Sequence, residues 1–79
     1  MFEYNISNQA DTDLFYRQCL ALEENIPGLA AEDLLKDVDG TLVQKYSHSR
    51  GAVTVKNDMQ INALYVESDF DLLPYFKKS

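Results

Sequence analysis

The clearest pattern along the chain is a helical repeat of apolar positions over residues 13–25. Four apolar residues recur at steps of four, three and four, which places them on one face of an α-helix. Pro27 and Gly28 then end the helix, because proline restricts the residue before it and glycine permits a turn. The segment is therefore predicted to be an amphipathic helix whose apolar face comprises Phe15, Cys19, Leu22 and Ile26.

A second helical piece is predicted over residues 29–36. Its apolar positions are Ala30, Ala31, Leu34 and Leu35. At about two turns such a helix is marginal by itself, so packing against the rest of the domain must stabilise it.

After residue 40 the pattern changes to period two, which is typical of β-strands with one buried face. Short segments rich in Asp, Asn, Ser and Gly separate three such runs. Strands joined by tight turns form an antiparallel meander. The three predicted strands occupy residues 41–48, 52–56 and 59–67.

The two ends complete the predicted fold. Residues 2–6 alternate and predict a short edge strand or an extended arm. Asp69 is placed to cap one helical turn before Pro74, and residues 77–79 are predicted to be a solvated tail. We expect an α+β fold in two layers, with helical segments packed on one face of a small three- or four-stranded antiparallel sheet. The length fits a single domain, residues 1–79.

Cysteine content and the N-terminus indicate the compartment. The chain has one cysteine, Cys19, so it cannot form an internal disulfide. Its first residues lack the basic and apolar regions of a signal peptide, and no apolar run approaches the roughly 20 residues of a membrane helix. We therefore expect a cytoplasmic protein that does not enter a membrane.

The formal net charge is −6 and is unevenly distributed. Residues 1–39 carry nine acids and two bases, whereas residues 40–79 carry four acids and five bases. An acidic first half repels a phosphate backbone, which disfavours direct nucleic-acid binding. It would attract a basic protein partner, or would let the domain mimic nucleic acid in a basic groove.

Residues 37–43, Asp-Val-Asp-Gly-Thr-Leu-Val, resemble the first motif of the haloacid-dehalogenase-like phosphatases. That resemblance implies a magnesium-dependent enzyme in which Asp37 attacks phosphorus and Asp39 is the acid/base. The family places its motif after a buried parallel strand on a much larger fold. Here a charged segment predicted to be helical comes first, and Asp-x-Asp-Gly-Thr also fits a helix-to-strand turn. The phosphatase is retained as the alternative function.

Residues 51–55 and 61–66 resemble the central strands of the GNAT acetyltransferases. In that family a glycine-rich loop follows and binds the pyrophosphate of acetyl-coenzyme A. Here residues 67–71 contain no glycine and three acids, which would repel a pyrophosphate. The sequence therefore predicts no cofactor.

Other reactive side chains give no catalytic constellation. His48 is the sole histidine and is predicted to be an exposed turn residue. Cys19 lies on the apolar face of the predicted helix and is interpreted as a small buried hydrophobe. With one histidine and one cysteine, a zinc site of nitrogen and sulfur ligands is disfavoured, and we predict neither metal ligands nor catalytic residues.

Aromatic residues gather at both ends of the chain, next to acidic residues. Exposed aromatics flanked by charge are typical of protein interfaces. We expect a non-catalytic protein-interaction domain, such as a regulator, an inhibitor, an immunity-type protein or an accessory factor. A homodimer joined through the sheet edge is a further alternative. The predicted contact residues are Phe2, Tyr4, Glu67, Asp69, Phe70, Asp71, Tyr75 and Phe76.

Overall fold

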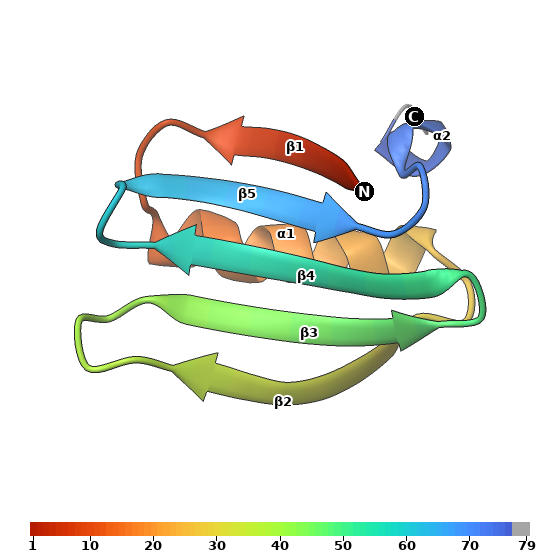
Figure 1. Cartoon of the computed structure of the whole chain (residues 1–79), viewed down its shortest axis with the longest axis horizontal. Helices are drawn as coiled ribbons and strands as arrows, with labels where there is room; N and C mark the ends of the chain where they lie inside the picture. The colour runs from red at the N-terminus through yellow and green to blue at the C-terminus, as the bar shows by residue number, and fades with distance from the viewer. Residues whose placement is uncertain (77–79) are drawn as a thin grey trace.

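The computed structural model describes residues 1–76 and contains one five-stranded antiparallel sheet with strand order β1-β5-β4-β3-β2 (Figure 1). Strands β2 to β5 form a meander, and β1 pairs with β5. The α+β class is confirmed, but the sheet has five strands rather than three or four. The elements in chain order are β1 (Phe2–Ser7), α1 (Thr12–Asn25), β2 (Ala30–Lys36), β3 (Leu42–His48), β4 (Gly51–Asp58), β5 (Ala63–Ser68) and α2 (Leu73–Phe76).

Helix α1 matches the predicted helix within one residue. A side-chain oxygen of Asp11 accepts a hydrogen bond from the backbone N–H of Leu14, which satisfies one of the unpaired donors of the first turn. Ile26 is the C-cap in an extended conformation, and its N–H donates to the carbonyl of Leu22. The helix stops there because Pro27 follows.

The helix lies across one face of the sheet, behind β4 and β5 in the view of Figure 1. Its apolar face joins one core cluster with side chains from β3, β4 and β5. The hydroxyl of Tyr46 on β3 donates to Oε2 of Glu23 at 2.7 Å and to the carbonyl of Cys19 at 3.4 Å. The completely buried members of the cluster include Phe15, Tyr46, Val53, Val55, Leu64, Val66 and Leu72.

The prediction of a helix over residues 29–36 is wrong, because this segment is strand β2. It pairs antiparallel with β3, from Ala30 opposite Ser47 to Lys36 opposite Leu42. Pairing with β3 satisfies the backbone groups of this segment that point toward β3, whereas an isolated two-turn helix leaves most of its terminal groups unpaired.

The ends of the chain are close to the prediction. The extended segment at residues 2–6 is the edge strand β1. The helical turn α2 includes Pro74, and the carboxylate that accepts from its first amide, Leu73 N–H, is Asp71 rather than Asp69. The predicted solvated tail at residues 77–79 lies outside the described residues. Among the described helices, none is long and apolar enough to span a membrane.

Candidate interaction site

Strand β2 forms one edge of the sheet, and all seven of its residues are exposed. Helix α1 does not extend over it (Figure 1). Two large apolar side chains lie on it, Leu34 at 42% exposure and Leu35 at 50%. Successive strand residues point to opposite faces, so these two leucines make both faces of the edge apolar.

A register shift bends β2 near its middle. Ala31 pairs with Tyr46 and Leu34 pairs with Gln44, so Glu32 and Asp33 lie opposite the single residue between them on β3. This is the geometry of a β-bulge. The side-chain amide of Gln44 donates to the carbonyl of Glu32 at 2.7 Å and so anchors the bulge.

Between the bulge and the turn, β2 is regular. The backbone N–H of Asp37 donates to the carbonyl of Thr41 at 2.9 Å, which fixes the phase of the ladder. Hydrogen-bonded and non-hydrogen-bonded pairs alternate along antiparallel strands. Leu34 and Lys36 therefore belong to non-hydrogen-bonded pairs with β3, and their backbone groups point away from the sheet.

The segment that resembles a phosphatase motif is the hairpin turn between β2 and β3. The N–H of Gly40 donates to the carbonyl of Asp37 at 3.1 Å, and Gly40 has a φ of 92°. This is a three-residue loop with glycine in the left-handed position. The turn joins two antiparallel strands. The predicted helix-to-strand turn is therefore wrong about the segment before the turn, which is strand β2 and not a helix. The buried parallel strand that precedes this motif in the phosphatases has no counterpart here, because β2 is antiparallel and exposed.

The two motif carboxylates accept hydrogen bonds from the turn itself. An Asp37 oxygen accepts from the N–H of Val38 at 2.7 Å, and an Asp39 oxygen accepts from the N–H of Thr41 at 2.9 Å. The bond from the Thr41 backbone lowers the pKa of Asp39 below its usual value, because it stabilises the ionised form. Both carboxylates thus stabilise the turn.

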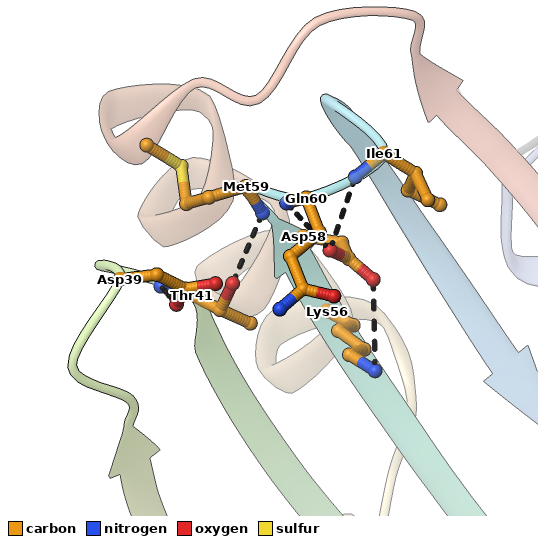
Figure 2. A network of polar contacts seen from close by, with 7 residues as sticks. All are labelled: Asp39, Thr41, Lys56, Asp58, Met59, Gln60 and Ile61. Carbon is orange, nitrogen blue, oxygen red and sulfur yellow. Dashed lines mark hydrogen bonds and ion pairs between the residues drawn. The ribbon is translucent and has the colours of Figure 1, made fainter.

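The β4–β5 turn lies against this hairpin (Figure 2). The N–H of Met59 donates to Oγ1 of Thr41 at 3.0 Å, and Asp58 accepts from Gln60 N–H at 2.9 Å. Nζ of Lys56 lies 3.7 Å from Oδ2 of Asp58. The bond from Met59 to Thr41 joins two loops that are 18 residues apart in the sequence, and the other two contacts stabilise the β4–β5 turn itself.

A shallow pocket of about 330 Å³ opens at this corner. Its wall mixes carboxylates with two lysines and the side chain of Leu35. Within residues 1–76, no group of three or more His, Cys, Asp or Glu side chains is placed to hold a metal ion. The lining residues are Leu35, Lys36, Asp37, Asp39, Thr41, Val43, Lys56, Asp58 and Gln60.

Part of the predicted contact set lies where the two chain ends meet. The hydroxyl of Tyr4 donates to an Asp71 oxygen at 2.8 Å and accepts from the N–H of Leu72 at 2.8 Å. The ring of Tyr4 packs edge-to-face on Phe76, with centroids 5.0 Å apart. Burial raises the pKa of Tyr4. These contacts fasten the C-terminal segment to β1, and the half-buried Tyr75 packs against the core.

The other predicted contact residues are dispersed. Phe70 is only 5% exposed, and its ring lies 4.9 Å from that of His48 and 5.0 Å from the guanidinium of Arg50. Asp69 exchanges hydrogen bonds with the backbone of Ala52, at 2.8 and 3.0 Å. Phe2 is exposed on β1. Glu67 lies on the face of β5 opposite to the buried Val66 and Ser68.

His48 is the last residue of β3 and is partly buried, rather than the exposed turn residue that the sequence predicts. Its Nδ1 accepts from the backbone N–H of Arg50 at 3.1 Å, so Nε2 carries the proton in the neutral ring and donates to the carbonyl of Pro27 at 2.9 Å. The side chain therefore connects the end of β3 to the loop after α1.

Cys19 is buried as predicted, at 7% exposure. Burial raises the pKa of its thiol, which keeps it in the unreactive neutral form.

Leu34 and Leu35 were not predicted to be contact residues, because the sequence pattern assigns both to a helix packed on the sheet. The signal that could have found them is the Asp-x-Asp-Gly hairpin loop, which requires a strand before it. No protein-family model matches this chain, and no curated protein or solved structure matches it.

Proposed function

We propose that this chain is a non-catalytic protein-interaction domain whose contact surface is the edge formed by β2 and the turn after it. The observation that carries the proposal is that all seven residues of β2 are exposed, including its two large apolar side chains, Leu34 and Leu35. Val38 at the tip of the turn is also fully exposed and extends the apolar surface.

An open edge strand is a template for pairing with another chain, and natural proteins usually block it with proline, lysine or a covering element. Strand β2 has no proline, and its single lysine is Lys36 at its end. The bulge at Glu32 and Asp33 protects only its middle. An edge left this open supports a role in binding.

The eight contact residues predicted from the sequence lie outside β2 and are less suitable as a contact surface. Tyr4 donates a hydrogen bond to Asp71 and packs on the ring of Phe76, and Phe70 is buried. Their use in binding would require those internal contacts to be shared with a partner. The cytosol is the proposed setting. With Cys19 as its single cysteine, the chain has no internal disulfide of the kind that stabilises small domains in oxidising compartments.

The test is affinity capture of the tagged domain at about 50 and about 500 mM salt, with mass spectrometry of the retained proteins. The variant Leu34→Lys/Leu35→Lys removes the apolar edge. Leu20→Lys is the matched control, because Leu20 is equally exposed but lies on α1. We expect one stoichiometric partner with the unchanged chain and the control, and its loss with the double variant.

Retention of the same partner by the double variant would refute the assignment of the surface to β2. Failure of the unchanged chain to retain any stoichiometric partner would refute the proposed function. Dispersed NMR spectra of all three proteins establish that each is folded.

A further inference from the structure

We infer that β2 binds an extended, basic segment of a partner protein, which adds to the sheet as a sixth strand beside it. This inference rests on the proposed function and specifies the chemistry of the partner. It follows from three features of β2: backbone groups that point away from the sheet, the side chains of Leu34 and Leu35, and the negative charge of the edge.

The backbone supplies the hydrogen bonds. Residues Leu34 and Lys36 direct their N–H and carbonyl groups away from β3, as the ladder phase requires. Both residues are exposed, so an incoming strand can reach these groups. The opposite edge is less open, because α2 lies beside the start of β1 and Phe76 packs on Tyr4 (Figure 1).

The side chains of the edge specify the residues of the incoming strand. Leu34 shares a face with Gln44, and Leu35 shares the other face with Val43, so each face of the edge offers one leucine. Cross-strand neighbours of these leucines should be apolar. The neighbours of Glu32 and Asp33 should be basic, because both carboxylates are exposed at the bulge.

Charge selects the occupant. The edge and its turn carry four carboxylates, Glu32, Asp33, Asp37 and Asp39, against the single ammonium of Lys36. Two copies paired through β2 would bring eight carboxylates together with two lysines, and like charges across strands are destabilising. A second copy is therefore a poor occupant, and a basic segment of another protein is complementary.

The test uses a synthetic lysine–valine peptide of about eight residues, in which two adjacent valines are flanked by lysines, blocked at both ends. Binding is followed by amide NMR shifts and by hydrogen exchange of the ¹⁵N-labelled domain. We expect shift changes concentrated on β2, slower exchange at the Leu34 and Lys36 amides, and affinity that falls about tenfold when salt is raised above the physiological range.

Two control peptides separate pairing from charge attraction. One carries N-methyl groups on every residue, which keeps its charge and removes the backbone donors of both edges. The other replaces lysine by glutamate. We expect neither to bind. Equal binding of the N-methylated peptide, or shift changes centred on β1, would overturn strand addition at β2.

Variants of the domain test the same edge. Glu32→Gln/Asp33→Asn should weaken binding of the lysine–valine peptide about tenfold. Glu3→Gln/Glu24→Gln makes the same change in net charge at exposed sites on β1 and α1 and should leave binding within about twofold. Equal weakening by both pairs would show that only net charge matters and would overturn the inference. Leu34→Pro, which removes an outward N–H, should also abolish binding.

Two outcomes separate this inference from the proposed function. A captured partner that the β2 variant loses, with no binding of the lysine–valine peptide, would overturn strand addition and leave the function standing. Sedimentation that shows dimers dissociated by Leu34→Lys/Leu35→Lys would identify a second copy as the occupant and overturn the basic-segment assignment.

Discussion

The hydroxyl of Tyr46 donates a 2.7 Å hydrogen bond to Oε2 of Glu23, and this bond joins the centre of the sheet to α1. The Tyr46 ring is completely buried, while Glu23 is exposed on the helix. Burial raises the pKa of Tyr46, so its hydroxyl stays protonated and remains the donor.

Replacement of Tyr46 by phenylalanine should lower the free energy of unfolding by about 1 kcal/mol. The ring continues to fill the core, so the loss reports the hydrogen bond. Glu23 can hydrate when its partner is removed, which keeps the effect moderate. Urea denaturation measures the change. Tyr16→Phe is the control, because Tyr16 is exposed on α1 and should change stability by less than about 0.5 kcal/mol. Equal effects of the two substitutions would contradict the role assigned to the bond.

Gly51 cannot accept a side chain. It has a φ of 139°, and a Cβ added there would lie 2.5 Å from the Cβ of Asp69. Asp69 is itself fixed by two hydrogen bonds to Ala52. We expect Gly51→Ala to lower the free energy of unfolding by about 2–4 kcal/mol, through backbone strain and overlap together.

Gly28 provides the comparison for this substitution. It also has a positive φ, of 80°, but an added Cβ would meet only His48, at an ordinary 3.8 Å. Gly28→Ala should therefore show backbone strain alone, about 1 kcal/mol. Equal losses in the two variants, measured by urea denaturation, would show that the approach of Asp69 adds nothing.

The helix and the meander could be predicted from the sequence because each has a local cause. The apolar repeat of α1 is uninterrupted, and the alternation in β3 and β4 keeps its phase. In β5 the predicted start was too early, because residues 59–62 form the turn, with a φ of 53° at Asn62.

Strand β2 was not predicted because its bulge gives the apolar residues a spacing that is typical of a helix. Ala31 and Leu34 are three residues apart and yet share a face, since Glu32 and Asp33 both lie opposite one residue of β3. A spacing of three within a run of Ala, Glu, Leu and Lys favours a helix in any local interpretation. The segment was thereby assigned to a short helix packed on the sheet.

The role of the terminal aromatics depends on contacts that no local pattern encodes. Tyr4 and Asp71 are 67 residues apart, and their hydrogen bond exists only because β1 pairs with β5. The sequence shows that these side chains are present, whereas the sheet topology determines that they bond to each other.

Protonation of Asp39 should weaken the β2–β3 hairpin. The Thr41 N–H lowers the pKa of Asp39 below 3.8 in the folded chain, so the unfolded chain binds more protons near that pH. The stabilisation is complete above 3.8 and is lost as the pH falls through the folded value. Carboxyl ¹³C NMR should show Asp39 titrating below 3.8.

Asp39→Asn keeps an acceptor oxygen for the Thr41 N–H and removes the titration. The fall in stability as the pH is lowered below 3.8 should be smaller in this variant than in the unchanged chain. Identical pH profiles would show that the turn does not stabilise the ionised carboxylate.

Cys19 should react slowly with an aromatic disulfide reagent in the folded protein. The thiol is buried and its pKa is raised, so reaction requires local or global opening. At about pH 8 we expect a rate roughly a hundredfold below that of the urea-denatured chain. The variant Cys19→Ala/Leu20→Cys moves the thiol one residue along α1, to an exposed position. The thiol at position 20 should react at close to the rate of the denatured chain, because this position is exposed to solvent, whereas position 19 faces the sheet. A folded-state rate for Cys19 equal to that of the shifted thiol would mean that α1 does not pack on the sheet as described.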